Sequence, residues 1–187
     1  FMTMKRNSIL SFAIISTVLI FSTSCNKDNG GGINIFTVDD DKQLGLQMEQ
    51  EIKSNPAEYP LLDENQYPTP YEHMKDVRNS ILATDQVAFD SEFEWAVYII
   101  RDDSVLNAFC TPGGYIYVYT GLIKYLDTED QLAGVMAHEI AHADLRHSTR
   151  QMTKTYGIAA LVSIVTGKSE PGLIEQIALG LVSLKFS

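Results

Sequence analysis

His138, Glu139 and His142 form the run His-Glu-Ile-Ala-His, in which two histidines stand four residues apart. On a helix, residues at this spacing lie on one face, so both imidazoles point to a common site where Zn²⁺ can bind at about 2.0–2.1 Å. Glu139 lies beside that site, where it can take a proton from a zinc-bound water and pass it to a leaving amine. The pattern therefore predicts zinc-dependent hydrolysis of a peptide bond.

The residues before this run predict the helix that must carry it. Thr128 and Gln131 have the spacing of a capping box, and Glu129 and Asp130 place negative charge where the helix dipole favours it. We therefore expect a helix from about Thr128. An apolar stripe and a set of small residues predict that it is buried, so its polar side chains need partners or a metal. The stripe comprises Leu132, Val135, Met136, Ile140 and Leu145, and the small residues are Ala133, Gly134, Ala137, Ala141 and Ala143.

The residues after the run restrict the third metal ligand. Metzincins need Gly and His three and six residues after the second ligand, where this chain has Leu145 and Ser148, which excludes that class. His147 would lie on about the opposite side of the helix from His138, so we interpret it, with Arg146, as a helix C-terminal residue that complements the dipole. The remaining arrangement is a His₂Glu site with a glutamate from a later helix.

Three blocks of sequence carry a resemblance to a known family. Residues 107–122, residues 130–137 before the histidine run, and the pair Arg146-His147 occur in the family's order and spacing. The chain resembles the HtpX-like and CAAX prenyl protease-like zinc metallopeptidases, in particular their soluble BepA-like lipoprotein branch. The resemblance covers roughly residues 36–187 and implies an α+β gluzincin fold with a small sheet, one catalytic Zn²⁺ per chain and endopeptidase activity.

The resemblance also predicts where the third ligand lies. In the family it is a glutamate of a later helix, in a segment that would begin where this sequence reaches residues 184–187. We therefore expect this ligand beyond Ser187 and an incomplete, C-terminally truncated metallopeptidase domain over residues 37–187, of low activity by itself and part of a longer protein. Glu175 is a weaker substitute for the ligand.

Asn107, Ala108 and Phe109 form a candidate substrate-binding segment. In gluzincins that resemble thermolysin, an Asn-Ala-Phe segment lies on an edge strand upstream of the zinc helix and pairs with the substrate backbone. An unpaired edge can bind an extended peptide, which favours cleavage of unfolded chains. An ordinary strand and turn is the alternative interpretation.

The N-terminus has the features of an export signal. Residues 1–24 contain a short basic region, an apolar stretch and small residues before Cys25. We expect a signal peptide over 1–24, a lipidated Cys25, and a flexible tether over 25–36 that holds the domain at a bacterial outer membrane facing the periplasm, with surface exposure as a variant. A plain secretory signal is the alternative.

The charge restricts the classes of macromolecule that the chain can bind, and the cysteine content restricts the disulfide bonds that it can form. The formal net charge of −10 makes nucleic acid an unsuitable partner. Of the two cysteines, Cys25 is the predicted lipid site, so Cys110 has no intramolecular disulfide partner and is predicted to be a small buried apolar residue.

The remaining pattern predicts the supporting elements. We expect helices over residues 37–54 and 71–83, with a proline-containing loop over 59–70 between them. Strands are predicted over 95–100 and 115–119, with a tight turn at Gly113-Gly114. Apolar helices are predicted over 156–165 and 173–186, each too short to span a membrane.

Together these features predict a zinc endopeptidase that acts on unfolded or misassembled envelope proteins and is attached to the membrane by its lipid. Two alternatives remain open. One is a chaperone-like binding module with a non-catalytic zinc site, which would not need Glu139. The other is a zinc hydrolase of non-peptide amides.

Overall fold

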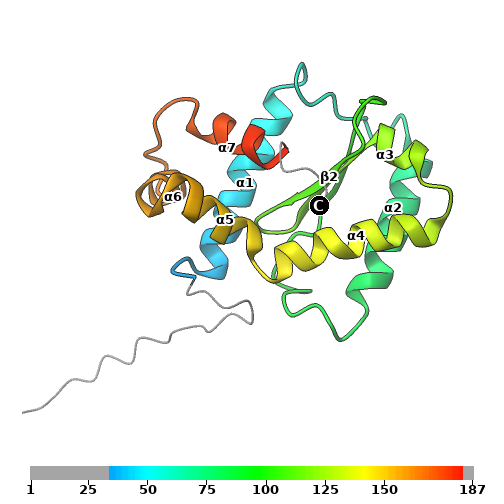
Figure 1. The fold of residues 1–187 in the computed structure, drawn as a ribbon, viewed down its shortest axis with the longest axis horizontal. Helices are drawn as coiled ribbons and strands as arrows, with labels where there is room; N and C mark the ends of the chain where they lie inside the picture. The colour runs from blue at the N-terminus through cyan, green and yellow to red at the C-terminus, as the bar shows by residue number, and fades with distance from the viewer. Residues whose placement is uncertain (1–33, 183–187) are drawn as a thin grey trace, which may run out of the picture.

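A three-stranded sheet lies at the centre of the domain (Figure 1). The computed structural model describes residues 34–182, so the predicted leader and Cys25 lie outside the described residues. The strands are β1 (Val97–Ile100), β2 (Ala108–Thr111) and β3 (Tyr115–Tyr119), in the order β1-β3-β2. β3 runs parallel to β1 and antiparallel to β2, so β2 is an edge strand.

Helices cover both faces of the sheet (Figure 1). Side chains alternate along β3, so Ile116 and Val118 pack with α2 (Pro68–Leu82) and α4 (Glu129–Asp144), whereas its tyrosines pack with the opposite layer. That layer comprises α1 (Val38–Ser54), α5 (His147–Tyr156), α6 (Ile158–Val165) and α7 (Leu173–Val182). The predicted mixed α+β class is confirmed.

Local sequence fixes the first helix and its contact with the sheet. The Thr37 hydroxyl accepts a hydrogen bond from the Asp40 backbone N–H at 3.1 Å, which confirms the predicted start of α1. Gly45 allows α1 to approach the turn between β2 and β3, because a Cβ there would lie 1.9 Å from the Pro112 oxygen. Gly113 and Gly114 have φ angles of 76° and 86°, as the predicted tight turn requires.

Two predicted boundaries are wrong for local reasons. α2 begins at Pro68, three residues before the predicted start, because the first turn of a helix tolerates proline. β1 begins at Val97 rather than at residue 95, because Trp95 has a φ of 46° and leaves the extended conformation. The indole N–H of Trp95 donates to the Phe89 oxygen at 3.0 Å.

The segment after α4 differs most from the prediction. The helix predicted over 156–165 corresponds to α6, which begins at Ile158, two residues later than predicted, because Gly157 with a φ of 84° separates it from α5. α5 and the short α3 (Thr120–Tyr125) were not predicted. Within residues 34–182, no helix has the length and apolar character needed to cross a bilayer.

Candidate active site

α4 presents the histidine run at a fixed orientation because its first turn is capped. The Thr128 hydroxyl accepts from Gln131 N–H, and the Gln131 side-chain oxygen accepts from the backbone N–H groups of Asp127 and Thr128. The prediction that α4 is buried holds for only one side of the helix: the sheet covers that side, whereas Leu145 is 38% exposed and Gly134 faces open space. His138 is therefore exposed and His142 half-buried, whereas Glu139 is buried.

The two imidazoles of α4 converge as the spacing predicted. His138 Nε2 and His142 Nε2 lie 2.9 Å apart, and their rings are nearly perpendicular. Two nitrogen ligands of one tetrahedral Zn²⁺ lie roughly 3.3 Å apart when each bond is about 2.0–2.1 Å. The separation of the two nitrogen atoms is close to this value, so the pair fits a shared zinc ion.

Glu139 lies on the buried side of α4, against β2. Its side chain is 6% exposed, and its carboxylate accepts a hydrogen bond from the Cys110 backbone N–H. Burial raises the pKa of Glu139 to about 7, and the hydrogen bond from Cys110 opposes this rise. A carboxyl with this pKa can both accept and donate a proton near neutral pH.

β2 exposes only part of its edge toward α4. The register with β3 turns the backbone groups of Asn107 and Phe109 toward β3, and those of Ala108 and Cys110 outward. Outward bonds occupy both groups of Cys110, because its N–H donates to Glu139 and its oxygen accepts from the Ser148 hydroxyl at 3.1 Å. Among the described residues, no such bond occupies the Ala108 backbone.

The three residues of the predicted substrate segment therefore have different positions. The Asn107 oxygen accepts from Tyr119 N–H at 3.1 Å, and the Phe109 ring stacks on Tyr117 at 4.7 Å, in the layer opposite α4. Ala108 alone faces α4 and has outward backbone groups. Cys110 is buried, as predicted, and burial raises the pKa of its thiol.

The prediction for His147 is wrong. α4 ends at Asp144, so the rotation expected for a continuous helix does not apply, and His147 is the first residue of α5. Its Nδ1 lies 3.0 Å from His142 Nδ1. Burial and neighbouring cationic groups lower the pKa values of both His142 and His147. The only sequence signal for this contact was the Arg146-His147 pair in the family block.

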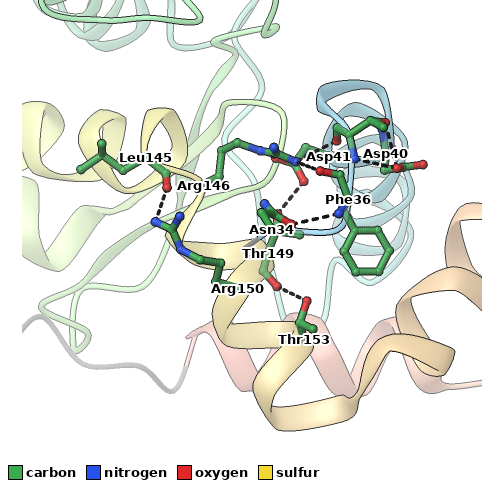
Figure 2. Close-up of polar contacts among 10 residues, drawn as sticks. Asn34, Phe36, Asp40, Asp41, Leu145, Arg146, Thr149, Arg150 and Thr153 are labelled. Atoms are coloured by element: carbon green, nitrogen blue, oxygen red, sulfur yellow. Dashed lines mark hydrogen bonds and ion pairs between the residues drawn. The ribbon is translucent and has the colours of Figure 1, made fainter. Parts of the chain in front are cut away.

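Arg146 follows the C-terminal end of α4, but its guanidinium is directed to α1 and does not complement the dipole of α4 as predicted. It is 2% exposed and has a φ of 56°, and Figure 2 shows its side chain reaching α1. Its Nε donates to Asp41 Oδ2 at 2.5 Å, and its Nη2 donates to the Phe36 and Thr37 oxygens at 2.7 and 2.8 Å. The Thr149 hydroxyl donates to the other Asp41 oxygen at 2.7 Å. Sequence reasoning missed this buried network.

The described residues do not supply a third ligand. Within residues 34–182, His, Cys, Asp and Glu side chains form no group of three or more that could hold a metal ion. Glu175 lies in the first turn of α7 and is exposed, so the structure does not bring the proposed substitute to His138 and His142.

These features are typical of a metallopeptidase domain. They are a capped helix with two converging imidazoles, a buried glutamate between the two histidines in the sequence, and a sheet edge beside the helix. The chain belongs to peptidase family M48, whose model matches residues 72–177. This finding confirms the family predicted from the sequence blocks.

Relatives of the chain carry peptidase names. It is 39% identical over 72 residues to the mitochondrial metalloendopeptidase OMA1 of Schizosaccharomyces pombe, covering 38% of this chain and 21% of that protein. It is 34% identical over 111 residues to a putative beta-barrel assembly-enhancing protease of Vibrio cholerae, covering 57% and 22%. The corresponding Escherichia coli protease is 46% identical over 55 residues, covering 29% and 11%. The matches thus span no more than about a fifth of these relatives.

Proposed function

We propose that the chain is the catalytic domain of a zinc-dependent endopeptidase of gluzincin type, in which His138 and His142 are zinc ligands and Glu139 is the general base and acid. The observation that carries the proposal is the approach of the two Nε2 atoms to 2.9 Å beside a buried carboxyl. Membership of peptidase family M48 and the metalloendopeptidase names of relatives support it. The third ligand, a glutamate, is assigned outside the described residues.

The proton transfers belong to Glu139. A bound Zn²⁺ supplies a Lewis acid that polarises the scissile carbonyl and lowers the pKa of a water to about 7. Glu139 accepts the proton of the attacking water and then donates it to the leaving amine. The Cys110 N–H holds the carboxylate at the end of β2, and burial keeps its pKa near 7, which suits both steps. His138, which is exposed, and His142, which is half-buried, would hold the metal.

The substrate pairs with the outward edge of β2. Because the Cys110 groups are already bonded to Glu139 and Ser148, Ala108 offers the backbone N–H and C=O to an extended peptide. Asn107 and Phe109 contribute by fixing Ala108 against β3 and the tyrosine layer. Folded proteins rarely present an unpaired strand, so this edge selects unfolded or misassembled chains.

The site of action that we propose is the bacterial cell envelope, with attachment through a lipid on Cys25. The names of the Vibrio cholerae and Escherichia coli relatives, beta-barrel assembly-enhancing proteases, support an envelope substrate. Cys25 and the proposed leader over 1–24 lie outside the described residues. Mass spectrometry of the mature protein tests the anchor, since a mature form that begins elsewhere contradicts it.

Replacement of Glu139 by Gln tests the catalytic assignment. In the protein at its full natural length, we expect Glu139→Gln to keep its zinc and to lose at least about 10²-fold in the rate of cleavage of unfolded casein. Glu170→Gln makes the same chemical change at an exposed glutamate of a loop and serves as the control.

Equal zinc content with unchanged turnover in Glu139→Gln would contradict the role of Glu139. Cleavage of small amides but not of casein would favour the non-peptide hydrolase. A protein that keeps its biological effect in Glu139→Gln would be a binding module.

A further inference from the structure

We infer that His147 is a positioning residue that fixes the ring of His142 in the tautomer and orientation needed for metal binding. The inference rests on the proposed function in one respect, that His142 is a zinc ligand. The contact that carries it is the 3.0 Å separation between His147 Nδ1 and His142 Nδ1.

The three imidazoles form a chain. His142 uses Nε2 toward His138 and Nδ1 toward His147, so both nitrogens of its ring have a partner. His147 contacts the Nδ1 edge of His142, whereas the edge that converges with His138 is the Nε2 edge. The geometry therefore assigns His147 to orienting His142 rather than to binding the ion.

The backbone before His147 is held in a strained conformation. Arg146 has φ 56° and ψ 34°, a left-handed conformation that costs a non-glycine residue free energy and persists only where surrounding contacts enforce it. These contacts are present in Figure 2: Arg146 donates to Asp41, and Thr149 donates to the same carboxylate. Both sides of His147 are thereby fixed to α1.

The turn at Arg146 determines which ring nitrogen atoms of His142 and His147 carry a proton. Arg146 ends α4 and starts α5 in a new direction, which carries His147 back to the ring of His142. Metal-binding histidines generally donate their second ring N–H to a fixed acceptor, which sets the tautomer and the ring orientation. Here the acceptor is a second imidazole, so His142 carries its proton on Nδ1 and His147 carries its proton on Nε2.

The test removes or preserves a polar atom at the position of His147 Nδ1. His147→Leu removes the acceptor, whereas His147→Asn keeps an amide near the same position. His73→Leu is the matched control, because His73 lies on α2, half exposed near Glu129 and away from this chain of imidazoles. All three are made in the protein at its full natural length, and the probe is Zn²⁺ alone in competition with a chromophoric chelator.

We expect His147→Leu to weaken zinc binding about 10–100-fold, His147→Asn to recover most of the loss, and His73→Leu to equal wild type. In the metal-free protein, the ¹⁵N shifts of His142 should report the Nδ1–H tautomer in wild type and a shift toward Nε2–H in His147→Leu. A purely structural role of His147 would not move the tautomer.

Unchanged zinc affinity and an unchanged His142 tautomer in His147→Leu would overturn the inference. Equal loss in His147→Asn and His147→Leu would also overturn it, because the polar atom would then be irrelevant. If wild type binds no zinc, the proposed function fails. The tautomer measurement on the metal-free protein then still decides whether His147 orients His142.

Discussion

Asp41 and Glu139 both have buried carboxyl groups, but the hydrogen bonds and charges that offset the cost of burial differ between them. Asp41 is 1% exposed and receives hydrogen bonds from the Arg146 guanidinium and the Thr149 hydroxyl. Glu139 is 6% exposed and, among the described residues, its carboxylate receives one backbone hydrogen bond, from Cys110. Burial raises the pKa of both groups, and at Asp41 the bond and charge of Arg146 oppose that rise.

The difference in hydrogen-bond partners indicates that Asp41 stabilises the fold, whereas Glu139 is available for proton transfer. Asp41 is bonded on both oxygens and connects α1 to the turn after α4 (Figure 2). Among the described residues, no cationic side chain contributes to the pKa of Glu139, which burial raises to about 7. Strongly shifted groups without full compensation are typical of sites where protons move. The comparison predicts opposite responses when each carboxyl is changed.

The largest effect should follow from breaking the Asp41 pair. Arg146→Met removes the cation but keeps much of the side-chain length, so Asp41 is left buried without its charge partner. We expect the free energy of unfolding to fall by about 3–5 kcal/mol, the usual cost of breaking a buried ion pair. Urea denaturation followed by circular dichroism measures it.

Two controls separate the buried charge from the loss of the arginine itself. Arg101→Met changes an exposed arginine and should shift stability by no more than about 0.5 kcal/mol. The double variant Asp41→Leu with Arg146→Met removes both charges and should lose less than the single Arg146→Met. A double variant that is less stable than Arg146→Met would contradict the uncompensated charge as the cause.

A matched pair of amide substitutions sharpens the comparison. Asp41→Asn should lower the free energy of unfolding by at least about 2 kcal/mol, because Arg146 is left buried without its counter-charge. Glu139→Gln keeps an oxygen acceptor for the Cys110 N–H and loses no cationic partner, so its stability should stay within about 0.5 kcal/mol of wild type or exceed it. Chelator-treated proteins, unfolded in urea, give both values, and equal losses would remove the distinction.

The parts of the site that the sequence predicted depend on short-range signals. The Thr128 and Gln131 capping box fixes where α4 begins, and the four-residue spacing then fixes that His138 and His142 converge. The alternation and β-branched content of residues 115–119 likewise identified β3. These features need no knowledge of distant residues.

The missed parts depend on residues far apart in the chain. Arg146 takes a left-handed conformation because Asp41, 105 residues earlier, bonds its side chain in the folded state. The Arg146-His147 pair in the family block marks this position, but no local pattern beside Arg146 indicates the turn, so α5 and the His142–His147 contact were missed. The burial of α4 was overestimated for a related reason: its apolar stripe shows that one face packs, but not how far neighbouring elements cover the other faces.

The smallest effect concerns the second oxygen of Asp41. Thr149→Val keeps the shape of a fully buried side chain but removes the hydroxyl that donates to Asp41 at 2.7 Å. A hydrogen bond to a charged group contributes about 1.5–3 kcal/mol. The ion pair with Arg146 remains in this variant, so we expect a loss near 1.5 kcal/mol in the free energy of unfolding, at the lower end of that range.

Thr153→Val is the control for Thr149→Val, one turn further along α5 (Figure 2). Its hydroxyl donates to the Thr149 backbone oxygen at 2.7 Å, a local bond within the helix that adds little stability. Urea unfolding of both variants should therefore show a clear loss for Thr149→Val and about 0.5 kcal/mol or less for Thr153→Val. If the two losses are equal, the Thr149 hydroxyl acts as an ordinary helix side chain, and Asp41 is compensated by Arg146 alone.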